Sequence, residues 1–191
     1  MPGVAGGLRP EDAIVREAAE FVSPFGAMGY FVRAPKEASS LFQDVARTVR
    51  VAARPEAAWA ALLDFPRVAS WLPVVRDLRE VEPLRRYTTV LEDRLGPFAM
   101  RADLQIDVAA DASQHRLRVS GAGEDRQVAS RISAALDLAV VPQGEGSDIV
   151  VSGRYEITGR IATLGAGAIR KKGEKVLEDF FANVSRELGA A

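Results

Sequence analysis

The chain has 191 residues, of which 48% are hydrophobic and 27% are charged, as in an ordinary globular domain rather than a disordered or membrane-spanning chain. Its 25 basic and 26 acidic residues leave a formal net charge of −1, so no overall positive field attracts nucleic acid. The chain has no cysteine, which excludes disulfides, thiolate metal sites and cysteine nucleophiles and fits a reducing compartment.

The N-terminal residues lack the apolar stretch of a secretion signal. No run in the sequence approaches the ~20 apolar residues that a membrane-spanning helix needs. We therefore expect a cytoplasmic protein, and we expect any contact with a membrane to be peripheral, at its inner face.

Residues 1–45 differ in pattern from the rest of the chain. Apolar residues at helical spacing predict a short helix after Pro10 and a second one from Pro35 to about Val45. We expect these residues to form a partly helical N-terminal appendage, and residues 46–191 to form one ligand-binding domain.

The main domain begins with an alternating strand pattern at residues 47–53. Pro55 then opens a helix, and a second short helix ends before Pro73. Six further strand-like stretches follow: 74–82, 86–95, 98–109, 114–121, 130–141 and 148–158. The turns between them are short, which predicts that neighbouring strands pair as antiparallel hairpins.

One face of the predicted sheet is apolar, and it needs a cover. The alternation is clearest at residues 98–109, where apolar side chains share one face while Arg101, Asp103 and Asp107 share the other. The long helical pattern at residues 160–188 supplies the cover, because its apolar residues recur at steps of three and four. This order of elements predicts an α+β helix-grip fold: a curved antiparallel sheet of about seven strands around a long C-terminal helix.

Small residues interrupt both the apolar face and the first half of the covering helix: Ala102, Gly121, Ala134 and Gly153 in the strands, and Gly165, Gly167 and Gly173 in the helix. They either line a dry cavity that accepts an apolar guest or let the helix pack tightly on the sheet. The sequence favours neither interpretation over the other.

Residues typical of catalysis are scarce. His115 is the only histidine, so no pair of histidines can hold a metal, and a lone histidine at a strand end is more often structural than catalytic. The glycine-rich stretches 120–123 and 165–167 lack the strand–helix context of a phosphate loop, and no serine lies in a nucleophile elbow. We therefore predict no catalytic residue, no metal and no cofactor, and the sequence favours a protein that is not an enzyme.

A basic run on the C-terminal helix contains Arg170, Lys171, Lys172 and Lys175. These side chains could contact anionic lipid headgroups. Acidic residues occupy the same turns, so a solvated helix face is the favoured interpretation.

Several short motifs together carry a family resemblance: Ala57-Ala58-Trp59, Leu95-Gly96-Pro97-Phe98, Ser120-Gly121-Ala122-Gly123, the stretch 157–165, and Phe180-Phe181. Over about residues 46–188 the chain resembles the carbon monoxide dehydrogenase CoxG family of the START-like, or polyketide cyclase-like (SRPBCC), superfamily. The resemblance implies a helix-grip domain with a deep apolar cavity. It also implies association with molybdenum hydroxylases of the carbon monoxide dehydrogenase type, recruitment of that enzyme to membranes, and binding of a quinone-like acceptor. Leu72-Pro73-Val74 departs from the proline-glycine pair that is common in the family.

The leading hypothesis is a carrier that holds a hydrophobic small molecule, a quinone or a lipid, in an internal cavity and serves such a hydroxylase. The predicted lining comprises Trp71, Met100, Leu104, Ile106, Leu117, Val119, Leu136, Leu138, Tyr155, Ile161, Leu164 and Ile169. Burial of apolar ligand surface would drive binding, and Tyr155 would supply one orienting hydrogen bond.

Two alternatives remain open. One is a cyclase or hydrolase-like enzyme on the same fold, for which His115, Tyr155 and Asp93 are the polar candidates. The other is a docking or assembly protein that acts through residues 1–45.

Overall fold

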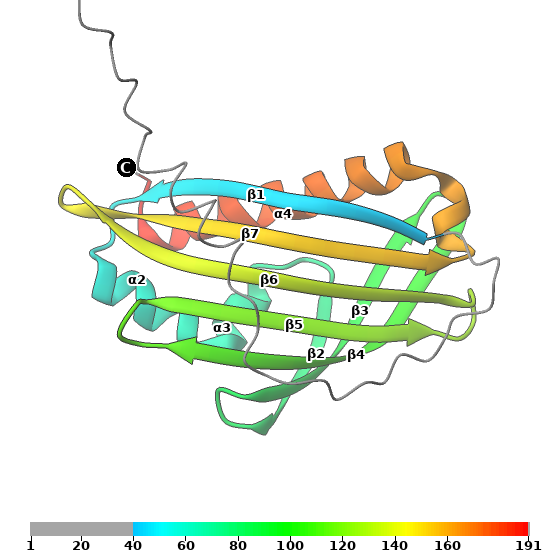
Figure 1. The fold of residues 1–191 in the computed structure, drawn as a ribbon, viewed down its shortest axis with the longest axis horizontal. Coiled ribbons are helices and arrows are strands. Elements are labelled where there is room, and N and C mark those ends of the chain that lie inside the picture. Colours follow the sequence, from blue (N-terminus) through cyan, green and yellow to red (C-terminus); the bar gives the residue numbers. More distant parts are fainter. Residues whose placement is uncertain (1–39, 191) are drawn as a thin grey trace, which may run out of the picture. The chain divides into compact units, whose positions relative to one another are not determined.

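The computed structural model describes residues 40–190, and its elements follow the order predicted for the main domain (Figure 1). A strand, two short helices, six strands, a 3₁₀ turn and a long helix succeed one another. They are β1 (Ser40–Val51), α2 (Pro55–Leu63), α3 (Phe65–Ser70), β2 (Val75–Glu82), β3 (Arg86–Leu95), β4 (Phe98–Asp111), β5 (Arg116–Asp125), β6 (Ser130–Gln143), β7 (Gly146–Gly159), η1 (Ile161–Leu164) and α4 (Ala166–Leu188).

The seven strands form one antiparallel sheet in the order β1-β7-β6-β5-β4-β3-β2. From β2 to β7 each strand pairs with its neighbour in sequence, as the short turns predicted. The first strand pairs with the last, from Ser40 opposite Thr158 to Val51 opposite Ser147. The predicted helix-grip fold is therefore confirmed.

The helix predicted from Pro35 to Val45 is wrong for residues 40–45, because these residues form the first half of β1. Leu41 lies opposite Ile157, and Val45 lies opposite Gly153. A spacing of four residues places two side chains on one face of a helix and also on one face of a strand. The spacing of Leu41 and Val45 could not distinguish the two structures. The part of the predicted helix before residue 40 lies outside the described residues.

The continuous helix predicted over residues 160–188 is interrupted at Gly165. This glycine has φ 88° and ψ 155°, a conformation that an L-residue rarely adopts and that cannot continue a helix. As a result η1 ends before it and α4 begins after it. The rest of the predicted covering helix is confirmed.

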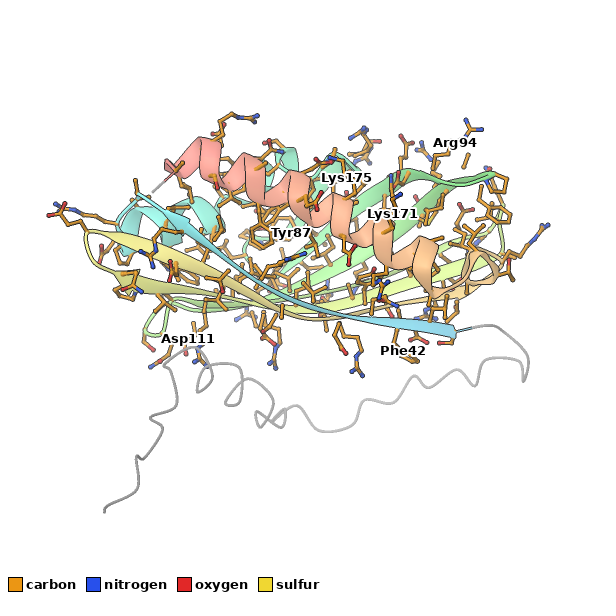
Figure 2. All side chains as sticks on the ribbon, turned by 90° about the horizontal axis from the view of Figure 1, so that it is seen from above. Phe42, Tyr87, Arg94, Asp111, Lys171 and Lys175 are labelled. Atoms are coloured by element: carbon orange, nitrogen blue, oxygen red, sulfur yellow. The ribbon has the colours of Figure 1, made fainter. Side chains whose placement is uncertain are left out.

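The helix α4 lies across the concave face of the curved sheet (Figure 2). Its backbone lies next to β1, η1 and β3. Near its C-terminal end, Phe180 and Val184 are buried in a core cluster that also contains Trp71 and Leu62. Near its start, Ile169 is buried in a second cluster with Met100 and Ile161.

Candidate functional site

A row of paired residues crosses the middle of the concave face. Ile106, Gly121, Ala134 and Tyr155 are successive partners on β4, β5, β6 and β7, and partners in register point to the same side of a sheet. The hydroxyl of Tyr155 donates to the carbonyl oxygen of Ile169 on α4, at 3.3 Å. This row therefore faces the helix.

The small residues gather at the centre of this face. In the next row Val119 pairs with Leu136, which in turn pairs with Gly153. The centre of the concave face therefore carries a patch of small side chains with aliphatic side chains around it. The patch comprises Gly121, Ala134 and Gly153. Because a Cβ at Gly121 would meet only ordinary contacts, the nearest at 3.6 Å, this position has room for a methyl group.

The predicted lining residues divide into two equal groups by burial. Core residues, buried on all sides, are Trp71, Met100, Leu117, Leu138, Ile161 and Ile169. Partly buried residues are Leu104, Ile106, Val119, Leu136, Tyr155 and Leu164. Three of the second group, Ile106, Val119 and Leu136, lie beneath α4 in the two central rows and yet keep accessible surface. They pack against the buried core cluster without being fully buried themselves.

Two hollows in the surface lie on the opposite, outer face of the sheet. They measure about 610 Å³ and 490 Å³ and are lined mostly by polar and charged residues, among them Arg101, Asp103 and Gln105. Such walls do not suit an apolar guest. The cavity predicted between α4 and the sheet stays a prediction.

The outer face is polar, as the alternation predicted, and it carries ion pairs between neighbouring strands. Arg86 pairs with Asp107 at 2.9 Å, and Arg154 pairs with Asp44 at 2.7 Å. The hydrogen bond from Arg154 lowers the pKa of Asp44. Exposed pairs of this kind stabilise a fold only weakly.

The glycines of the helix have different surroundings. A Cβ at Gly173 would lie 2.1 Å from the hydroxyl oxygen of Tyr155, whereas no atom lies within 4 Å of one at Gly165 or Gly167. Gly173 therefore serves tight packing of the helix on the sheet. The other two glycines lie in open space at the start of α4.

Two polar groups lie on the concave side near the first half of α4. Burial raises the pKa of Tyr155, with a further contribution from the carboxylate of Glu174. The carboxylate of Asp93 on β3 pairs with the ammonium of Lys172 on α4, at 2.6 Å between Oδ1 and Nζ. The sequence pattern places Lys172 in a solvated run and misses its contact with the sheet, because helical periodicity alone does not place the neighbouring strand.

Two other residues of the basic run, Arg170 and Lys175, have partners on their own helix. Arg170 lies 3.9 Å from Glu174, and Lys175 lies 2.5 Å from Asp179. This pairing favours the solvated-face interpretation. Figure 2 shows Lys171 and Lys175 on α4.

His115 lies far from the other two polar candidates. Its ring stacks on Trp59 of α2, with the ring centroids 5.5 Å apart, and it follows the far end of β4. Asp93 pairs with Met100 near the start of β4, and the intervening strand spans about 35 Å at ~3.3 Å per residue. His115, Asp93 and Tyr155 therefore do not converge on one reacting centre.

Tyr87 is a residue of this face that the sequence did not single out. It lies opposite Ile106, is 1% exposed and stacks on Phe65 with ring centroids 4.7 Å apart. Its hydroxyl donates to Glu80 at 3.2 Å and accepts from the backbone N–H of Leu84 at 3.1 Å. Its place below α4 (Figure 2) follows from the register of β3 with β4, which the sequence pattern did not define.

Within residues 40–190, no group of three or more histidine, cysteine, aspartate or glutamate residues is placed to hold a metal ion. None of the helices in this part of the chain is long and apolar enough to cross a membrane.

Comparison with known proteins identifies a family and a fold. The CoxG family, described as the G-subunit family of carbon monoxide dehydrogenase, matches residues 48–189. No curated protein matches the sequence.

Solved structures with the same fold have low sequence identity to this chain. A conserved protein from Geobacillus kaustophilus is 17% identical with a TM-score of 0.63, covering 78% of this chain and 95% of its own. A START superfamily protein from Mycobacterium smegmatis is 13% identical with a TM-score of 0.57, covering 76% and 96%. A truncated norcoclaurine synthase from Thalictrum flavum is 14% identical with a TM-score of 0.52, covering 80% and 98%.

Proposed function

Because this chain belongs to the carbon monoxide dehydrogenase CoxG family, we propose that it binds a hydrophobic small molecule between α4 and the concave face of its sheet. The ligand is of the quinone or lipid type. The protein carries it as an accessory to a molybdenum hydroxylase of the carbon monoxide dehydrogenase type, with at most a peripheral contact at the membrane.

The observation that carries this proposal is the apolar patch around Gly121 and Ala134. Aliphatic residues border it, α4 covers it, and Ile106, Val119 and Leu136 nevertheless keep accessible surface. Exposed apolar surface is costly in water, at about 25 cal/mol per Å². A hydrophobic guest that covered this surface would gain that free energy without needing a charged partner.

The enzyme alternative receives no support from the placement of polar groups. Acid–base catalysis needs groups within hydrogen-bond reach of one reacting centre, and His115 lies at the other end of β4 from Asp93. The docking alternative depends on residues 1–45, of which only residues 40–45 lie in the described part of the chain, as the first half of β1. It remains a separate proposal.

Neighbouring alanines on β6 allow a matched test. Ala134 faces α4, whereas Ala135 is exposed on the outer face. We expect native mass spectrometry of the purified full-length protein to show a bound apolar molecule, and decylubiquinone to bind the emptied protein. Ala134→Phe should fill the patch and weaken this binding at least about tenfold, whereas Ala135→Phe should leave it unchanged.

Equal binding by the two phenylalanine variants would place the ligand elsewhere. Failure of the wild-type protein both to carry an apolar molecule after purification and to bind decylubiquinone would refute the carrier proposal.

A further inference from the structure

The two halves of α4 are attached to the rest of the molecule in different ways. In the second half, Phe180 and Val184 are buried, and the side-chain amide of Asn183 donates to the carbonyl oxygen of Trp71 at 2.8 Å. Arg67 of α3 pairs with Glu187 at 3.2 Å. In the first half, Ile169 is the one residue that is buried. The C-terminal half of α4 is therefore anchored by packing, and the N-terminal half has much less of it.

An ion pair adds to the limited packing of the first half. Asp93 occupies an inward position of β3, between Leu91 and Leu95, and its side chain is 13% exposed. Its Oδ1 accepts from Lys172 at 2.6 Å and from the backbone N–H of Arg94 at 2.7 Å. A carboxylate at such a position is costly unless it is paired. Lys172 supplies the charge partner, and in doing so it joins α4 to the sheet.

The backbone that precedes this ion pair favours movement. Gly165 separates η1 from α4 with a positive φ of 88°, and neither Gly165 nor Gly167 has a neighbour that a Cβ would meet. Such glycines absorb changes in φ and ψ with little steric cost. A hydrogen bond of 3.3 Å from Tyr155 to Ile169 also holds this part of the helix.

From these observations we infer that the Asp93–Lys172 ion pair is a latch, and that the first half of α4, Ala166–Gly173, is a gate over the apolar patch. When the latch opens, the helix bends at Gly173, where the gate ends, and Gly165 and Gly167 absorb the backbone change at its start. The half anchored by Phe180, Val184 and Asn183 stays in place. The role of the gate in ligand entry rests on the proposed carrier function. The latch itself does not.

Hydrogen–deuterium exchange of the full-length protein without ligand tests the latch. We expect Asp93→Asn and Lys172→Met each to speed amide exchange in Ile169–Val176 about two- to tenfold, with no change in Phe180–Leu188. The control Lys171→Met removes a positive charge from the neighbouring position, which is exposed and has no ion pair among the described residues. It should leave both segments unchanged.

Exchanging the two charges provides the rescue. The variant Asp93→Lys with Lys172→Asp keeps the combined reach of the two side chains, so slow exchange in Ile169–Val176 should return. The latch is refuted if the single variants leave this segment unchanged, if they affect Phe180–Leu188 equally, or if Lys171→Met has the same effect.

A second measurement separates the latch from the carrier function. In stopped flow, release of the apolar dye 1-N-phenylnaphthylamine should be faster from Asp93→Asn than from the wild type, by about the same factor as amide exchange. A wild type that does not bind the dye, together with the expected amide exchange, would count against the carrier function and leave the latch supported. Normal dye binding with unchanged release and unchanged amide exchange would count against the latch alone.

Discussion

Tyr155 on β7 lies directly under Gly173 on α4, so close that a Cβ at position 173 would come within 2.1 Å of the tyrosine hydroxyl oxygen. Because Gly173 has no side chain, the helix can pack directly on the ring of Tyr155 at this point. Because the Tyr155 hydroxyl also donates to Ile169, neither residue can change without affecting the other.

Gly173→Ala should destabilise the protein. The added methyl group overlaps the Tyr155 ring, and overpacking of this kind costs about 1–3 kcal/mol. Urea unfolding at neutral pH measures the loss. Gly167→Ala is the control, because its methyl group would meet no atom within 4 Å, and we expect it to be neutral or more stable by at most about 1 kcal/mol. Equal effects of the two changes would contradict the tight contact.

Asn183→Ala should also destabilise the protein, by about 1–3 kcal/mol, because it leaves the carbonyl oxygen of Trp71 without its donor. Thermal unfolding followed by tryptophan fluorescence reports on this change, since Trp71 lies beside it. Arg186→Ala, an exposed position in the same turn, is expected to change stability by less than about 0.5 kcal/mol. A neutral Asn183→Ala would show that the second half of α4 does not depend on this bond.

Ser130→Ala removes a bridge between β6 and η1. The hydroxyl of Ser130 accepts from the backbone N–H of Ile161 at 3.0 Å and donates to the carbonyl oxygen of Val128 at 3.1 Å. The variant leaves a buried N–H unpaired, so we expect a loss of about 1–3 kcal/mol in chemical unfolding. Ser133→Ala on the same strand should change little, and a similar loss there would point to a general effect of serine removal in β6.

Stability should fall at alkaline pH. Burial raises the pKa of Tyr87 above its usual value of 10.0, and it also raises the pKa of Tyr155. The folded state therefore holds these protons more tightly than the unfolded state does. The resulting stability is fully present below pH 10 and is lost as the pH rises through the folded-state pKa values.

Urea unfolding between pH 8 and pH 11 checks this expectation, with absorbance at 295 nm reporting ionisation of tyrosine. Tyr87→Phe should show a smaller decrease in stability over this range than the wild type. An identical pH dependence in the two proteins would mean that Tyr87 ionises equally easily in the folded and unfolded states.

The sheet could be predicted from sequence because its alternation is strong. Arg101, Asp103 and Asp107 point away from Met100 and Leu104 on one strand, and no other element gives that period. The errors fall where the pattern is compatible with two structures, as at Leu41 and Val45, or where one backbone angle decides the outcome, as at Gly165.

The site could be predicted only in part. The alternation of side chains along each strand placed Ile106, Val119 and Leu136 on the covered face. It could not show that they are less deeply buried than Leu117 and Leu138 on the same face. Depth beneath the helix depends on sheet curvature and on where α4 crosses, and neither is encoded in a single strand. The ion pair of Lys172 could not be predicted for the same reason, because its partner Asp93 lies on β3 and the position of the helix over that strand is not evident from the sequence.

The early start of β1 matters for any shortened version of the protein. The family match begins at residue 48, but Ser40 to Arg47 already pair with the second half of β7, from Thr158 to Val151. Trimming the chain to the family match would leave that half of β7 with unpaired backbone amides along an open edge. Such an edge recruits strands from other molecules, so self-association in solution is the expected outcome of trimming there.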